Sequence, residues 1–280
     1  CFSALVIDGY YQHYTGVNLF GYKLIGSRVS SFFGDEKILG SYLSRLFPLV
    51  FALFLIKKKK KFEIYFIGIL FILVDVLIYM SGERSAFFFL NLSTVFIIIL
   101  IKEYQKFRLV TFIIAIICII ILSINSSHMS KRMFKDPAKN MGLFHSSKDR
   151  TIFTPIHDSL YRTAFNLFKD KSIKGHGPKM FRLLCKERQF ATGISPCSTH
   201  PHNFYIQLLA ETGILGFLFL FSSLVYVLYK ALRQFKCIIF NQKRPLTDYQ
   251  VCLLAGILIT VWPLSTNGNF FNNWLMITYS

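Results

Sequence analysis

The sequence predicts an all-α membrane protein, a polytopic bundle of transmembrane helices with one long extracytoplasmic loop that contains short helices. Several apolar stretches are long enough to cross a bilayer core of roughly 30 Å. In addition, 53% of the 280 residues are hydrophobic and 17% are aromatic. The net charge of +18 does not indicate nucleic-acid binding, because Lys and Arg in a membrane protein mainly mark the loops that face the cytoplasm.

Six stretches have the length of membrane-spanning helices, and several lie near the short limit of about 17 residues. They cover about 41–56, 62–80, 85–101, 109–124, 204–229 and 249–265. A seventh begins near Phe270 and is cut off by the end of the sequence. Since the sequence does not begin with Met and ends inside an apolar segment, we expect it to be a piece of a longer protein.

Positive charge indicates which loops face the cytoplasm. Basic residues crowd three short connections between spans, at Lys57–Lys61, Lys102–Arg108 and Lys230–Arg244. The positive-inside rule places these connections in the cytoplasm and the intervening loops on the other side of the membrane. The chain therefore divides into an outer loop plus four spans at 1–124, an extracytoplasmic loop at 125–203, and C-terminal spans at 204–280.

The long loop is also basic, which long loops tolerate because they cross the membrane largely regardless of charge. Its charge fits either an anionic ligand or a solvated loop beside anionic lipid headgroups. One amphipathic helix is predicted to open at Asp158 and to end at Gly175–Pro178, with an apolar face of Leu160, Ala164, Phe165 and Phe168. This helix either covers a site from outside or lies in the membrane interface.

The cysteines fall into two groups. Cys185 and Cys197 lie in the long loop, where a disulfide can persist outside the cytoplasm, and the sequence leaves open whether they are bridged. Cys118 and Cys252 fall within spans and Cys237 in a cytoplasmic loop, so each is most simply a buried or reduced residue. No Cys or His spacing indicates a zinc site, and neither a metal nor a cofactor is expected.

Arginines gather at the outer ends of the first spans. Arg84 follows the short turn Ser81–Glu83, and its side chain either snorkels to the interface or binds a phosphate through its planar fork of donors. Arg28 lies just outside the first span and Arg45 just inside it, which makes both further candidates for substrate binding. The alternatives are a solvated loop position for Arg28 and a structural ion pair or an interface anchor for Arg45. Asp75 either pairs with one of these arginines or faces a wet cavity.

Polar residues also stand at the start of the fifth span, where they are costly and rarely placed without a use. His202, Asn203 and Glu211 are the candidate functional residues here, and His200 is a neighbour that shapes the entry. A four-residue spacing predicts two pairs on shared helix faces, His202 with Ile206 and Gln207 with Glu211. Gly213 and Gly216 are expected to let a neighbouring helix come close.

These residue types fit the transfer of a group from a lipid-linked pyrophosphate sugar. Arginines can neutralise the diphosphate leaving group, and a His of pKa about 6.5 can take the proton of an acceptor hydroxyl. The basic loop and the three arginines favour this use of His202 over a helix cap or an interface residue.

The motif His202-Asn203-x-x-Ile206, separated by six residues from Gly213, resembles the signature of the O-antigen ligase and polymerase family. That family usually has Leu at the position of Ile206. The turn before Arg84 resembles the family's other marker, and Gly175-His176-Gly177-Pro178 resembles its Gly-x-Gly turn.

The resemblance implies a metal-independent C-type glycosyltransferase in the bacterial inner membrane, with its active site on the periplasmic side. His202 is then the base that activates the acceptor, and Arg84 and Arg28 bind the pyrophosphate of an undecaprenyl-linked glycan donor. Asn203, Glu211 and Arg45 are further candidates for contacting the substrate. The implied partners are this donor, a glycan or lipid A-core acceptor, and membrane lipids.

Three acceptors remain open: a repeat unit for a polymerase, which we slightly favour, lipid A core for a ligase, and a protein for an oligosaccharyltransferase. The alternative from another class is a lipid-glycan flippase or polysaccharide transporter. A transporter is expected to have charged or broken segments near the midplane and repeated halves. No internal repeat is apparent, and apart from Arg45 and Asp75 the polar groups collect at one membrane face.

Overall fold

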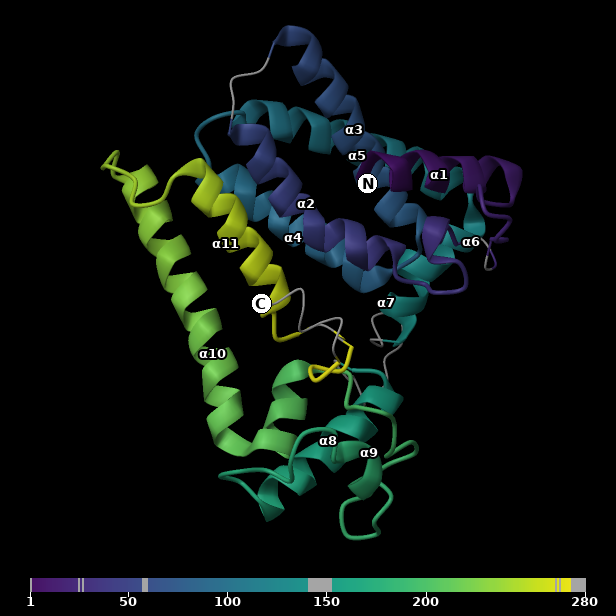
Figure 1. Cartoon of the computed structure of the whole chain (residues 1–280), viewed down its shortest axis with the longest axis vertical. Coiled ribbons are helices and arrows are strands. Elements are labelled where there is room, and N and C mark those ends of the chain that lie inside the picture. The colour runs from purple at the N-terminus through teal and green to yellow at the C-terminus, as the bar shows by residue number, and fades with distance from the viewer. Residues whose placement is uncertain are drawn as a thin grey trace. The chain divides into compact units, whose positions relative to one another are not determined.

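The computed structural model describes residues 2–24, 26, 28–56, 60–140, 153–264, 266 and 268–272. Within these ranges the regular structure is helical, and extended pairing is limited to an isolated bridge between Val17 and Lys23 (Figure 1). Part of the predicted lysine run, at 57–59, lies outside the described residues, as does the predicted seventh span beyond residue 272.

Each of the six predicted spans is a helix. Three are long and apolar enough to cross a membrane, namely α3 (Lys61–Met80), α5 (Gln105–Asn125) and α10 (Phe204–Ile239). Three are shorter apolar helices, namely α2 (Leu39–Leu55), α4 (Arg84–Leu100) and α11 (Asp248–Thr260). The structure thus confirms an all-helical protein with membrane-spanning helices.

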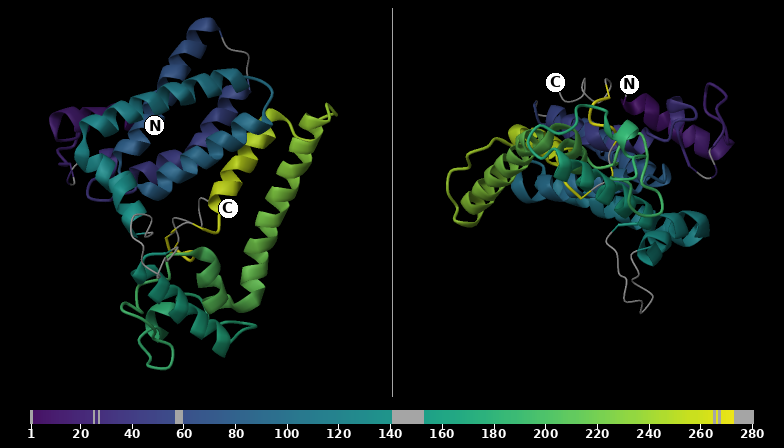
Figure 2. Two further views of the ribbon diagram at one scale, coloured as in Figure 1. Left: turned by 180° about the vertical axis from the view of Figure 1, so that it is seen from behind. Right: turned by 90° about the horizontal axis from the view of Figure 1, so that it is seen from below.

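The chain forms two compact units. The first contains 1–136 and 227–260. In it α2 and α4 lie side by side, α11 packs on both, and α3 packs on α5 (Figure 1, Figure 2). Phenylalanines from three helices form the centre of its core, namely Phe47, Phe51, Phe54, Phe71 and Phe107.

The segment before the first span was predicted as a loop, but Phe2–Thr15 form helix α1. Its apolar residues are interrupted by Asp8, Gln12 and His13, so the segment lacks the long apolar run by which the spans were identified. Asp8 and Gln12 lie four residues apart and are fully buried. Their oxygens accept hydrogen bonds from the loop that follows, and these bonds add to the packing of Leu5 and Val6 in the core.

A buried ion pair lies in the same unit. Arg108 was predicted to belong to a cytoplasmic loop, but it is in the first turn of α5 and fully buried. Its Nη1 and Nη2 atoms donate to Asp75 at 2.8 and 3.1 Å, and its guanidinium carbon lies 4.4 Å from the centre of the Phe47 ring. Asp75 therefore pairs with Arg108 and not with one of the three candidate arginines. Helix α5 begins before the predicted span, so this long side chain can reach into the bundle.

The second unit contains 137–226 and 261–280. Its predicted amphipathic helix is α8 (Pro155–Asp170), which begins earlier than predicted because Thr154 caps it and Pro155 occupies the first turn. Phe165 was assigned to the apolar face but is 44% exposed. The buried face is instead made of Ser159, Leu160, Thr163, Ala164 and Leu167.

Helix α10 is broken at Gly213, where φ is 66° and ψ is −160° (Figure 1). A Cβ atom at this position would collide with the backbone of Ile173 and Gly175, and a positive φ also favours glycine. We expected Gly213 to admit a neighbouring helix, and this was wrong. Gly213 bends α10 and makes room for a loop of the same unit.

Candidate functional site

The turn between α3 and α4 is fixed by Glu83. Its carboxylate accepts hydrogen bonds from the Gly40 and Ser41 amides at 2.7 and 3.0 Å and from the Ser41 hydroxyl at 2.6 Å. These amides lie at the start of α2, where N–H groups have no partner within the helix. Burial raises the pKa of Glu83, and the hydrogen bonds from Ser41 and Gly40 oppose that shift. Glu83 therefore joins the turn to α2.

Three arginines surround this turn and are held through their Nε atoms. Arg28 Nε donates to the Ser81 carbonyl at 2.8 Å, and Arg132 Nε donates to the Gly82 carbonyl at 3.0 Å. Arg84 Nε donates to the Arg132 carbonyl at 2.8 Å. We call Arg28, Arg84 and Arg132 the arginine cluster. Burial, and then the nearby charge of Arg132, lowers the pKa of Arg28, and the charge of Glu83 opposes this shift.

These hydrogen bonds are made by the Nε atoms and do not involve the terminal Nη nitrogens of the three guanidinium groups. Arg84 Nη2 lies 3.8 Å from Asp136 Oδ2, and both side chains are 41% exposed. An exposed ion pair of this length is weak. Arginine forks whose orientation is already fixed are suited to bind the oxygens of a phosphate.

Arg28 is positioned by the network on α1. Gln12 Oε1 accepts from the amides of Ser30 and Ser31 at 2.9 and 2.7 Å, and Asp8 accepts from the Ser31 hydroxyl at 2.6 Å. The chain two residues after Arg28 is therefore tied to buried side chains, which explains how a loop holds an arginine at the turn.

Arg45 lies in α2, and its guanidinium carbon is 5.4 Å from the centre of the Phe89 ring on α4. This is a cation–π distance. A role for Arg45 in substrate binding remains a prediction.

In the second unit His202 lies in the loop just before α10. It was expected to share a helix face with Ile206, but α10 begins at Phe204 and His202 has a φ of 63°. A non-glycine residue held at positive φ is strained, and such residues are common at functional sites. Its Nε2 lies 3.2 Å from the Ser198 hydroxyl.

Two further imidazoles lie beside His202. Its ring centre is 4.1 Å from that of His200 and 5.9 Å from that of His157. Burial, followed by the charges of His200 and His157, lowers the pKa of His202 to about 4. This is below the ordinary histidine value of about 6.5. His202 is neutral at physiological pH and has a lone pair that can accept a proton.

Asn203 and Glu211 both make internal contacts. Asn203 Oδ1 accepts from the Ile206 amide at 3.1 Å, as a helix N-cap does, and its Nδ2 donates to the Pro263 carbonyl at 2.7 Å. Glu211 accepts from the Phe181 amide at 3.0 Å and from Gln207 Nε2 at 2.8 Å. The predicted Gln207–Glu211 pair is confirmed, whereas contact of Asn203 or Glu211 with substrate remains a prediction.

The structure adds two candidates that were not selected from the sequence. Arg132 was counted only as one of many basic loop residues, and His157 lies just before the predicted start of its helix. Neither has a spacing that relates it to Arg84 or His202, so no sequence signal indicated them. His157 Nδ1 is 2.7 Å from the Thr154 hydroxyl that caps α8.

Cys185 and Cys197 form a disulfide, with their Cα atoms 5.2 Å apart. This settles the pairing that the sequence left open. Because disulfides persist mainly outside the cytoplasm, the bridge agrees with an extracytoplasmic position of this loop.

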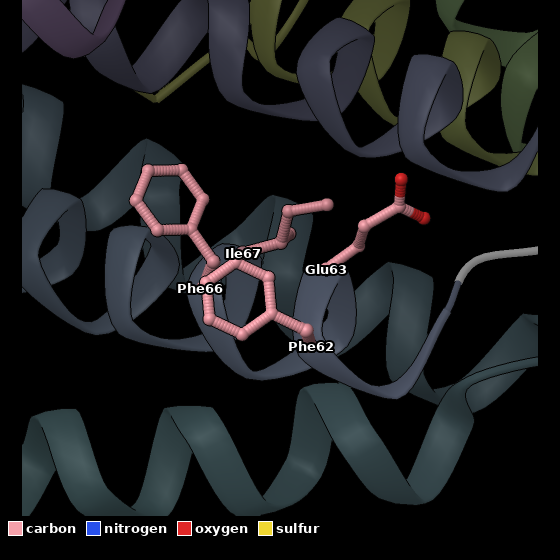
Figure 3. A pocket seen from close by; sticks show the side chains of 4 residues that line it. All are labelled: Phe62, Glu63, Phe66 and Ile67. Atoms are coloured by element: carbon pink, nitrogen blue, oxygen red, sulfur yellow. The ribbon is translucent and has the colours of Figure 1, made fainter.

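A shallow hollow at the start of α3 lies apart from the arginine cluster. It is lined by Phe62, Glu63, Phe66 and Ile67 (Figure 3). The Ser81–Glu83 turn follows the other end of this 20-residue helix, which is about 30 Å long. The Glu63 carboxylate already accepts the Lys60 amide at 2.8 Å, so nothing in this hollow suggests chemistry. Over the described ranges, no group of three or more His, Cys, Asp or Glu side chains is arranged to hold a metal ion.

Comparison with protein families gives a match over 66–221, to a family described as O-antigen ligase. The match covers more than half of the 280-residue chain. The chain belongs to the O-antigen ligase family. Comparison with curated proteins gave no match.

Membership of the O-antigen ligase family confirms the resemblance seen in the sequence. The protein is therefore an integral membrane protein and a glycosyl-transferring enzyme of polysaccharide biosynthesis. The matched range contains Arg84, His202, Asn203 and Glu211, whereas Arg28 and Arg45 precede it.

Proposed function

We propose that this protein transfers or polymerises an undecaprenyl-pyrophosphate-linked oligosaccharide at the periplasmic face of the bacterial inner membrane. The proposal rests above all on the arginine cluster, in which three guanidinium groups are anchored around one turn by Nε bonds to backbone carbonyls. Family membership supports the class of reaction.

In this proposal Arg84, Arg28 and Arg132 bind the pyrophosphate of the donor. Each guanidinium presents planar donors that match phosphate oxygens, and its positive charge stabilises the diphosphate as it leaves. The reaction then needs no metal ion to neutralise the leaving group.

His202 is the proposed base. The acceptor hydroxyl oxygen forms a bond to the anomeric carbon of the donor sugar while the bond from that carbon to the pyrophosphate oxygen breaks. The hydroxyl proton passes to His202, and the lipid diphosphate leaves with the bonding electrons. The lowered pKa keeps His202 unprotonated before the reaction, which is the state that a general base requires.

The periplasmic location is proposed from two independent observations. By the positive-inside rule, the basic connections favour a position outside the cytoplasm for the loops between them. The Cys185–Cys197 disulfide lies in one of those loops.

The proposal can be tested with the full-length protein in lipid vesicles that contain an undecaprenyl-pyrophosphate glycan. Repeat units, lipid A core or a protein acceptor are supplied in turn, with and without a chelator of divalent metals. We expect one acceptor to become glycosylated equally well in both conditions. Movement of the donor between leaflets without any glycosyl transfer would favour the flippase alternative, and loss of activity with the chelator would contradict the metal-independent mechanism.

A further inference from the structure

His202 is hydrogen-bonded to a residue that lies next to a disulfide. Within the part of the chain that the structure describes, the hydrogen bonding of the His202 ring consists of one contact, from Nε2 to Ser198 Oγ at 3.2 Å. Ser198 directly follows Cys197, whose partner is the fully buried Cys185. A loop residue in contact with the proposed base is therefore anchored by a covalent bond one residue away.

Hydrogen bonds connect the disulfide to α10, the helix that His202 precedes. The Cys185 amide donates to the Phe181 carbonyl at 2.9 Å, which closes the short helix α9 (Phe181–Leu184). The Phe181 amide donates in turn to Glu211 of α10 at 3.0 Å. Glu211 and Phe181 are both buried.

The segment just before α9 is also bound to α10, through backbone hydrogen bonds. The amides of His176 and Gly177 donate to the carbonyls of Ala210 and Glu211 at 3.1 and 2.8 Å. On the other side of His202, Asn203 caps α10. The chain from α9 through the disulfide to Ser198 and His202 is thus attached to α10 at both of its ends.

We propose that Ser198 is a positioning residue for His202 and that the Cys185–Cys197 disulfide holds it in place. In this proposal Ser198 Oγ accepts a hydrogen bond from Nε2–H, which favours the tautomer whose Nδ1 has the lone pair. Nδ1 is then the atom that takes the proton of the acceptor hydroxyl. In a neutral imidazole the partner of one ring nitrogen decides which nitrogen carries the proton.

The inference rests on the proposed role of His202 as the base. Without Ser198 the ring can adopt either tautomer and can rotate, so a smaller fraction of the enzyme has a lone pair directed at the acceptor. The expected loss is therefore in kcat and not in KM, since binding of the donor and acceptor is unchanged.

Two substitutions of Ser198 test the hydroxyl. In full-length enzyme in vesicles, Ser198→Ala should lower kcat roughly tenfold with KM unchanged, as expected for loss of one hydrogen bond. Ser198→Thr keeps the hydroxyl and should restore most of the activity. Ser195→Ala is the matched control, since Ser195 uses its amide, not its hydroxyl, to bond Ser159. An inactive Thr variant, or a rise in KM that accounts for the whole loss in Ser198→Ala, would overturn the role of the hydroxyl.

Reduction of the folded enzyme tests the tether without a risk to folding. A membrane-compatible thiol reductant should lower kcat of the unmodified enzyme about tenfold, and reoxidation should restore it. A Cys185→Ser, Cys197→Ser double variant should have the lower rate already and should not respond to the reductant. Full activity of the reduced enzyme, with free thiols verified by labelling, would overturn the role of the disulfide.

The failure of this inference differs from a failure of the proposed function. If His202→Ala removes transfer while Ser198→Ala and the reduced enzyme work normally, only the positioning role is wrong. If His202→Ala transfers glycan normally, the assignment of the base fails first.

Discussion

The arginine cluster and the loop around His202 hold their functional side chains in different ways. The cluster keeps permanent charges close together, and each guanidinium is held by a backbone carbonyl of a neighbouring segment. His202 is kept neutral by burial and by two imidazoles, in a loop fixed by a disulfide and by hydrogen bonds to α10. The comparison indicates that binding an anionic ligand requires donors of fixed orientation. A catalytic base requires control of both its protonation state and its orientation.

The largest effect is expected at the base. His202→Ala should lower transfer by about 10²- to 10⁴-fold, the usual contribution of a general base, while the amount of protein in the membrane stays the same. Rates of glycan transfer and immunoblots of membranes measure the two quantities. His13→Ala removes an exposed imidazole and serves as the control. A His202→Ala enzyme that keeps its activity would contradict the division of tasks between the two regions.

A smaller effect is expected in the arginine cluster. Arg84→Ala should lower kcat/KM by about 10- to 100-fold, because a hydrogen bond to a charged group contributes about 1.5 to 3 kcal/mol. Arg84→Lys should not restore it, since an ammonium group cannot form the planar two-point contact with phosphate. The control is Arg162→Lys in an exposed pair on α8, where the side chain is 67% exposed. A fully active Arg84→Lys enzyme would argue against phosphate recognition by this residue.

Two carboxylates that accept backbone hydrogen bonds allow the stability of the regions to be compared. Glu83→Ala leaves two amides at the start of α2 without their acceptor. Glu211→Ala removes the acceptor of the Phe181 amide and one of the two acceptors of Gln207 Nε2. Each change should destabilise the protein by about 1 to 3 kcal/mol. Thermal unfolding in detergent measures the loss. Only Glu211→Ala should also speed reduction of the Cys185–Cys197 disulfide, and equal reduction rates in the two variants would show that Glu211 does not hold that loop.

The smallest effect concerns pH. Because burial and neighbouring imidazoles disfavour the charged form of His202, kcat/KM should fall only as the pH drops toward about 4, and not near 6.5. His157→Ala should move this fall to higher pH, since it removes a charge that opposes protonation. The displacement should be small, because burial is the largest cause and His157 the smallest of the three. A pH profile of the unmodified enzyme that falls near 6.5 would show that His202 is more exposed to solvent during turnover.

The membrane helices could be predicted because a long apolar run has few other uses, and Arg84 and His202 could be selected because they interrupt such runs. Arg132 and His157 could not, since they reach the candidate residues only through folding of distant segments. Arg108 was assigned wrongly for the same reason. A basic residue just before a span is typical of a cytoplasmic loop, and only the folded structure shows that Arg108 pairs with Asp75 on another helix. Helix α1 was missed because Asp8 and Gln12 interrupt its apolar residues, and both are buried by hydrogen bonding to a later loop.

The disulfide has a consequence for how the enzyme matures. On the proposed topology, a bond between Cys185 and Cys197 forms after both residues have left the cytoplasm, where thiols are kept reduced. On the proposed role of Ser198, a newly made chain becomes fully competent in a fixed order, first by insertion of its helices, then by export of the loop, and last by oxidation. The catalytic activity of the protein then depends on the thiol-oxidising capacity of the compartment that it faces.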